Sequence, residues 1–415
     1  MIQQTDKRIF DALACALRGG TVSWTGELDA DAWEQLYRCA VKHYVLPLVT
    51  DALPPDIRHA EQPGEISAFA DRSKREILWQ AAKTGEMCLL YRHLRSKGLH
   101  PLVMKGIVCR EMYPEPEHRS SVDEDLLIKP AEYRRLHEVL LDYGLTSDVS
   151  DQNAAEQFEI SYRDDSRGLY IEVHKTPFTP DSPYLDRLND CFLGVHDRSI
   201  TQRICGTDFL TLGLEDHLLY LMLHALKHFL YSGFGIRQIC DIGLFAETHR
   251  HEIDWGSLRS RLKSVEAMDF VRAVFRIAGE YLLPENQMAE YLAEWDIFGV
   301  DAEPLLADVM DGGLYGAATM SRLHSSNMTL QAASSQSSQG VRAIMYSLFP
   351  PLDSMRGKFP YLKKLPVLLP FAWLQRQVGY LWELIRHRGR SNSALTSIRV
   401  GSERIRLLEK YNIIK

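Results

Sequence analysis

The sequence predicts an α+β fold, in which a small α/β domain with a mixed sheet is embedded between an N-terminal helical region and a C-terminal helical domain. Two observations predict it. Apolar residues recur at helical spacing up to about residue 95 and again after about residue 205. Between these stretches, short runs of strand type alternate with helical runs and turn-forming residues. The expected parts are a helical region (1–97), an α/β domain (98–204), a helical domain (205–324), a polar loop (325–340) and a basic helical region (341–415).

The N-terminal region is expected to end in one long helix. A Pro-rich break at residues 54–65 separates this helix from earlier helical stretches such as WEQLYRCAVKHYVLPLV. Gly98 is expected to end the helix, because glycine readily takes the left-handed conformation at a helix C-terminus. The predicted apolar face of the helix consists of Ile77, Leu78, Ala81, Met87, Leu90 and Leu94.

Four strands are expected in the α/β domain. Their sequences are PLVMK, VDEDLLIK, EQFEISYR and GLYIEVHK. A short helix over IVCREMY follows the first strand, and a longer helix over AEYRRLHEVLLDYGL follows the second and ends at Gly144. The turn-like DDSRG joins the last two strands.

The chain after residue 205 is expected to be helical. LEDHLLYLMLHALKHFLY and IRQICDIGLFAETH carry strong helical periodicity, and residues 255–310 continue it. The stretch SSNMTLQAASSQSSQG is polar and of low complexity, which predicts a loop.

The charge of the chain is divided unevenly. The 415 residues include 48 Lys or Arg and 55 Asp or Glu, a net charge of −7, which argues against binding of a template nucleic acid. Residues 351–415 contain 13 Lys or Arg and 4 Asp or Glu, a net charge of +9, so the first 350 residues carry −16. The aromatic and basic stretch LPFAWLQRQVGYLWELIRHRGR has two interpretations: a peripheral contact with a membrane or another anionic partner, or a terminal helix that packs its apolar face on the body.

The sequence also favours a cytoplasmic protein. Its seven cysteines are odd in number and form no C-x-x-C pair, as expected for free thiols in a reducing compartment. The N-terminus lacks the basic and apolar regions of a signal peptide. No stretch reaches about 18 uninterrupted apolar residues, the length that a membrane-spanning helix requires.

Three acidic residues in the α/β domain suggest a metal site. Asp123 and Asp125 lie two positions apart on a strand, so their side chains point to the same face. Two nearby carboxylates repel each other unless a cation lies between them, and Mg²⁺ prefers such oxygen ligands. Glu172 lies between apolar residues of a later strand. If the two strands are neighbours, all three carboxylates meet at one site for Mg²⁺, with Mn²⁺ as the alternative; otherwise Asp123 and Asp125 form a solvated strand end.

A set of short motifs, in a consistent order, resembles the uncharacterised nucleotidyltransferase family of the DNA polymerase β-like superfamily. The resemblance spans roughly residues 35–385. The matching motifs are Met104-Lys105-Gly106, Tyr113-Pro114, Arg119, Asp123-Glu124-Asp125-Leu126-Leu127-Ile128, Glu172-Val173-His174, His224 with His228, and Arg237 with Asp241.

The resemblance implies transfer of a nucleotidyl group from a nucleoside triphosphate (NTP), with release of pyrophosphate. It implies that Asp123 and Asp125 hold two metal ions and that Glu172 completes the metal site or serves as general base. The wider superfamily holds the triphosphate with Gly-Ser, where this chain has Lys105-Gly106 and no serine. We therefore expect Lys105, Arg119 and the start of the helix after Gly106 to contact phosphate. A surface arginine is the alternative for Arg119.

The histidines have less specific interpretations. His174 lies two positions after Glu172 and is expected to orient Glu172 or contact the acceptor, or else to be a hydrogen-bonded strand histidine. His224 and His228 lie on one helix face, and we favour their packing against the α/β domain, with Lys227 or His228 near the nucleotide as the alternative. Arg237 and Asp241 are expected to form a pair on a helix surface.

Three functions agree with these residues. The first is a nucleotidyltransferase that modifies a small molecule, a glycan or a modified peptide, acceptors that the resemblance suggests. The second keeps the fold but transfers a sugar from a nucleotide-sugar to a phosphorylated acceptor. The third is a non-catalytic binding subunit. Three clustered carboxylates argue against the third, because a module without metal chemistry has no need of them.

Overall fold

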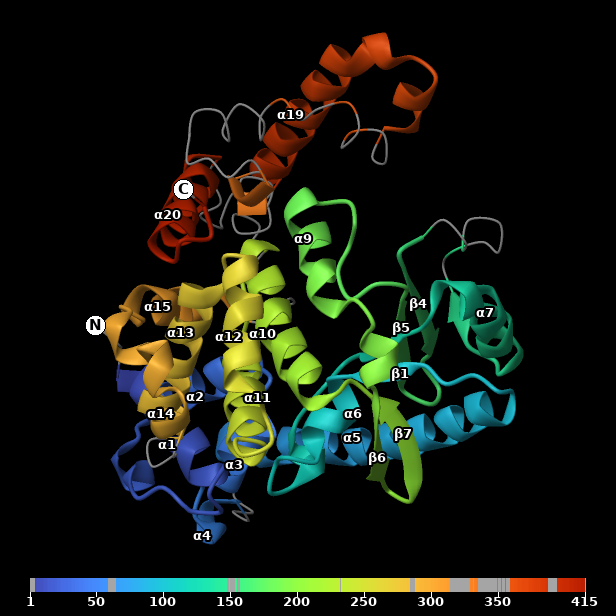
Figure 1. Cartoon of the computed structure of the whole chain (residues 1–415). Helices are drawn as coiled ribbons and strands as arrows, with labels where there is room; N and C mark the ends of the chain where they lie inside the picture. The colour runs from blue at the N-terminus through green and yellow to red at the C-terminus, as the bar shows by residue number, and fades with distance from the viewer. Residues whose placement is uncertain are drawn as a thin grey trace.

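The computed structural model of the chain is shown in Figure 1. It describes residues 4–58, 65–147, 157–231, 233–283, 288–313, 359–386 and 394–414, together with residues 149, 154, 329, 330, 332–334, 349, 352 and 355. Of the polar loop expected at 325–340, only residues 329, 330 and 332–334 are described, and these are helical. Half of the break expected at 54–65 lies outside the described residues, and Pro55–Arg58 form one helical turn.

A mixed seven-stranded sheet organises the α/β part, with strand order β3-β4-β5-β2-β1-β7-β6. Its central strands are parallel in the pairs β2–β5 and β1–β7 and antiparallel in the pair β1–β2. The strand bounds are β1 Leu102–Met104, β2 Glu124–Leu127, β3 Thr146–Ser147, β4 Glu159–Asp164, β5 Leu169–His174, β6 Ile200–Ile204 and β7 Thr207–Thr211. An α+β fold with a mixed sheet is therefore confirmed.

Helices cover both faces of this sheet (Figure 1). On one face Leu126 and Val173 pack with residues of α5 and α7. On the other, Met104 and Leu127 pack with α10 and the helices behind it. The helices are α1 Gln4–Ala16, α2 Ala30–Lys42, α3 Leu46–Asp51, α4 Pro55–Arg58, α5 Glu65–Ser96, α6 Gly106–Arg110, α7 Tyr133–Asp142, α9 Pro183–Leu188, α10 Leu214–Tyr231, α11 Ile236–Thr248, α12 Trp255–Ser264, α13 Met268–Ile277, α14 Met288–Tyr291, α15 Glu303–Gly312, α19 Leu369–Arg386 and α20 Ala394–Lys410.

Three strands were not predicted. The helical pattern resumes at Leu214 and not near residue 205, because β6 and β7 form an antiparallel hairpin across that point. The strand β7 extends the sheet by pairing with β1, so the hairpin belongs to the α/β part. Its residues, ITQRI and TDFLT, are mostly polar. The two-residue strand β3 is also new. The domain boundaries as a whole stay a prediction.

The long helix α5 differs from expectation in its first half. Its end is as predicted: Gly98 has φ +69° and the Leu99 amide donates to Leu94 O. Leu78 and Ala81, however, are exposed. After the buried Phe69, the next buried positions are polar, namely Ser73, Gln80, Lys83 and Thr84, and they continue into the apolar stripe of Met87, Leu90, Tyr91 and Leu94. The helix thus changes the chemistry of its buried face along its length, which an apolar pattern does not reveal.

The helix α19, in the basic C-terminal region, keeps several apolar side chains in solvent. Phe371, Leu374 and Val378 lie on successive turns and are each more than half exposed. The side chains of residues 379–386 lie outside the described residues, so the packing of the helix on the body stays a prediction. Ala372 joins a small cluster with Phe359 and Leu362.

Gly106 begins α6 with φ +46°, and a methyl group there would collide with the carboxylate of Glu124. We expect Gly106→Ala to lower the free energy of unfolding by about 2–4 kcal/mol, because both the backbone strain and the buried carboxylate oppose it. Urea denaturation measures the loss. Gly85→Ala is the matched control: Gly85 lies inside α5 with open space around it, so a gain of about 0.5–1 kcal/mol is expected. Equal effects at the two positions would contradict the explanation.

Candidate active site

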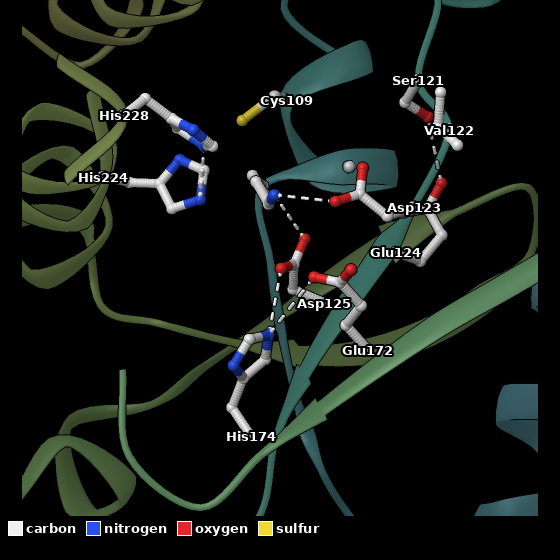
Figure 2. Close-up of polar contacts among 12 residues, drawn as sticks. Cys109, Ser121, Val122, Asp123, Glu124, Asp125, Glu172, His174, His224 and His228 are labelled. Carbon is white, nitrogen blue, oxygen red and sulfur yellow. Dashed lines mark hydrogen bonds and ion pairs between the residues drawn. The ribbon is translucent and has the colours of Figure 1, made fainter. Parts of the chain in front are cut away.

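The candidate site lies where β2 and β5 run side by side. Asp125 is the register partner of Glu172, and Leu127 is the partner of His174. Because side chains alternate along a strand, Asp125, Glu172 and His174 point to the same face. One ligand atom from each of these three lies within 4.8 Å of the others. Figure 2 shows the three side chains gathered together. Two carboxylates and an imidazole form a suitable donor set for a divalent cation.

Lys105, the residue after β1, connects the two aspartates of the motif. Its Nζ lies 3.2 Å from Asp123 Oδ2 and 2.9 Å from Asp125 Oδ2. Burial alone would lower the pKa of this ammonium group, but Asp123 and Asp125 hold the pKa well above its usual value. In turn, Lys105 holds the pKa of Asp123 below its usual range against the effect of burial.

Glu172 has the opposite electrostatic environment. Burial, together with the charges of Asp125 and Asp123, raises its pKa to about 8. Lys105 supplies one positive charge beside Asp123 and Asp125. A further cation bound beside Glu172 would stabilise the ionised form of this carboxyl group, which burial and the two aspartates disfavour.

The backbone of Lys105 is held in an unusual conformation, with φ +44°. Its amide donates to Nε2 of His217 at 3.1 Å, and His217 Nδ1 lies 3.3 Å from the hydroxyl of Thr211. That hydroxyl donates to the carbonyl of Val103. Burial lowers the pKa of His217 to about 3, so the ring is neutral and accepts the Lys105 amide. Sequence reasoning missed His217, whose only signal is a histidine inside a strongly apolar helix.

Glu124 points to the other face of β2 and binds two cations there. It forms ion pairs with Lys83 Nζ at 3.2 Å and with Arg110, and it accepts the Ile107 amide at 2.7 Å. This contact uses a donor at the start of α6 that was expected to bind phosphate. Gly106 is buried against the same carboxylate, so its role in the described structure is close packing. Glu124, Lys83 and Arg110 were not predicted as a cluster.

Arg119 is 2% exposed, so the surface alternative is wrong. Its guanidinium donates to both carboxylate oxygens of Asp241, each at 2.7 Å, and Tyr113 Oη also donates to Asp241. The expected surface pair of Arg237 with Asp241 is therefore wrong too. Arg237 instead donates to the carbonyl of Ser120.

A cavity of about 430 Å³ opens beside the carboxylates. Its size is within the range of small-molecule sites. Asp123, Glu159 and Glu172 form an acidic wall, whereas Lys227 and Arg237 supply positive charge from α10 and α11. His224 and His228 also line it, with their Nε2 atoms 3.2 Å apart (Figure 2). Sequence reasoning missed Tyr44, Glu159, Tyr170 and Gln238, which line the same cavity.

Residues 29–282, more than half of the chain, match the model of a family described as uncharacterised nucleotidyltransferase. The chain belongs to this family. The match stops at residue 282, earlier than the resemblance to about residue 385 that the motifs suggested. Neither the curated proteins nor the solved structures gave a match. Membership of a nucleotidyltransferase family supports a general function in transfer from an NTP and therefore nucleotide binding, and the buried cluster of acids and histidine fits metal binding.

A search of the described helices found none with the length and apolar character needed to cross a bilayer. The cytoplasmic location expected from the sequence stays a prediction.

Proposed function

We propose that this protein is a metal-dependent nucleotidyltransferase that transfers a nucleoside monophosphate from an NTP to a hydroxyl or phosphate acceptor. The observation that supports this most concerns Asp123, Asp125 and Glu172, here called the carboxylate rim. Asp123 and Glu172 line a cavity that Lys227 and Arg237 also line. Asp125 lies in one donor cluster with Glu172. A triphosphate needs both features: a cation held by carboxylates, and cationic side chains for its remaining charge.

Each wall of the cavity has a distinct role in this proposal. Asp125 and Glu172 hold the divalent cation, which supplies Lewis-acid stabilisation of phosphate charge when bound. Lys227 and Arg237 face the triphosphate from α10 and α11. The acceptor oxygen attacks the α-phosphorus, the bond from that phosphorus to the pyrophosphate oxygen breaks, and a hydroxyl acceptor loses its proton to the carboxylate rim. The protein contributes chiefly position and charge, as phosphoryl chemistry requires.

Calorimetric titration of the full chain tests the proposal. Each of the four common NTPs and a panel of nucleotide-sugars are titrated with and without Mg²⁺ or Mn²⁺. We expect at least one NTP to bind only with metal. Binding of a nucleotide-sugar alone would favour sugar transfer, and the absence of metal-dependent binding of either class would contradict both enzymatic functions.

Lys227 provides a test of the basic wall. Lys227→Met is expected to raise the Kd of the NTP about 10-fold, which is about 1.4 kcal/mol, because one cation facing the triphosphate is lost. The same titration measures the change. Lys263→Met, an exposed lysine on α12, is the control and should leave the Kd unchanged. Equal Kd values for the two variants would show that Lys227 does not contribute to nucleotide binding.

A further inference from the structure

The carboxylate rim offers two positions for a cation, and the two differ in their surroundings. One lies between Asp123 and Asp125, and the other lies among Asp125, Glu172 and His174. A pair of metal ions in this type of chemistry would use both positions.

The first position already contains a cation of the protein. Lys105 Nζ lies within 3.2 Å of one oxygen of each aspartate, with only 13% of its side chain exposed. The backbone of Lys105 is fixed by the hydrogen bond from its amide to His217, a residue 112 positions away. An ammonium group at that point and a metal ion coordinated by the same two oxygens exclude each other, because both are positive and need the same space.

The second position has a nitrogen donor. His174 Nε2 lies 3.2 Å from Asp125 Oδ1 and 3.9 Å from Glu172 Oε2. On the other side of the ring, Nδ1 lies 3.2 Å from Oε2 of Glu159, its register partner on β4. In the described structure the hydrogen bond of the ring is the one between Nε2 and Asp125, whereas the contact of Nδ1 with Glu159 lacks hydrogen-bond geometry. A metal ion bound at Nε2 would leave the ring proton on Nδ1, where the nearby carboxylate of Glu159 stabilises it.

We propose that this enzyme uses one divalent metal ion, held by Asp125, Glu172 and His174, and that Lys105 takes the place of a second ion between Asp123 and Asp125. The inference rests on the proposed function, since it concerns the same site. It also bears on the choice between the two expected metals: an imidazole ligand disfavours Mg²⁺, which prefers oxygen donors, relative to the transition ion Mn²⁺. Glu159 is a positioning residue, which orients His174.

Electron paramagnetic resonance of Mn²⁺ with the full chain tests this inference without any acceptor or turnover. We expect one bound Mn²⁺ per chain, and spin-echo modulation from one ¹⁴N nucleus. His174→Gln should remove this modulation and raise the Kd for Mn²⁺ at least 10-fold, whereas the control His224→Gln, in the same cavity, should keep the modulation. Lys105→Met should allow a second Mn²⁺ ion, whereas Lys227→Met should still bind one.

The outcomes separate this inference from the proposed function. Two Mn²⁺ ions on the unchanged chain, or one ion without ¹⁴N modulation, would contradict the inference that Lys105 replaces a second metal ion beside a histidine-bound one. Either result would still be compatible with a metal-dependent transferase. No Mn²⁺ binding at all would overturn both. If Lys105→Met does not fold, the number of bound Mn²⁺ ions and the ¹⁴N modulation of the unchanged chain still test the inference.

Discussion

Replacing Asp125 with asparagine is expected to weaken metal-dependent binding of the NTP by at least about 100-fold, or about 2.7 kcal/mol, and to abolish transfer. Asparagine keeps the shape of the side chain but not its charge. Asp125 is the register partner of Glu172, contacts Lys105 and lies beside His174. Its negative charge therefore acts on all three of these side chains. Titration of the NTP in the presence of Mg²⁺ or Mn²⁺ measures the effect.

The fold should tolerate this change, because Lys105 keeps its ion pair with Asp123. Thermal unfolding of Asp125→Asn without metal checks that the variant is intact. Asp31→Asn is the matched control, since Asp31 is exposed on the first turn of α2, far from the cavity in sequence and not among its lining residues. An Asp125→Asn protein that binds the metal and NTP within threefold of the unchanged chain would remove Asp125 from the site.

The second large effect concerns stability. Glu124→Gln is expected to lower the free energy of unfolding by about 3–5 kcal/mol, because it leaves the buried cations Lys83 and Arg110 without their shared counter-charge. All three side chains are at most 1% exposed, so water cannot replace the lost interaction. Urea denaturation measures the loss, and Glu138→Gln, on the exposed face of α7, should change stability by less than about 0.5 kcal/mol.

A second substitution distinguishes lost charge balance from lost packing. Lys83→Met in the Glu124→Gln background removes one uncompensated cation and should recover part of the stability. A double variant less stable than Glu124→Gln alone would contradict the charge explanation.

The pH dependence of stability gives an independent measure of the same cluster. Arg110 and Lys83 lower the pKa of Glu124 despite the opposing effect of burial. The carboxylate therefore contributes fully to stability above its unfolded pKa, near 4.3, and the contribution is lost as the pH falls through the lower pKa of the folded state. The decline in stability below pH 4.3 should be shallower in Glu124→Gln than in the unchanged chain.

The sequence was sufficient for the parts of the site that follow from strand geometry. The strands β2 and β5 are indeed neighbours, and the period of two brings Asp125, Glu172 and His174 to one face. Asp123 lies just before β2 and is linked to Asp125 through Lys105. The same period places Glu124 on the opposite face of β2. The motif alone therefore predicts that Glu124 lies apart from Asp125. The partners of Glu124 were not predictable, because Lys83 lies on α5 and no local pattern reports a contact across 41 positions.

The features that escaped prediction are those in which polar residues are buried. Arg119 and Asp241 lie 122 positions apart, and although both belong to motifs of the family, neither motif indicates that the two residues pair. The hairpin of β6 and β7 has too few apolar residues to show a buried face, although it completes the sheet beside β1. Polar burial is stabilised by specific partners, and those partners are known only when the fold is known.

The ion pair between Arg119 and Asp241 also has a consequence for the order in which the chain acquires its structure during synthesis. A ribosome that has completed the strands up to β7 has made Arg119 and Tyr113 but not their common partner on α11. Until residue 241 emerges, the nascent α/β part must leave this arginine in water or bind it elsewhere. Completion of the part of the α/β domain that contacts α11 is thus expected to wait for the helical segment.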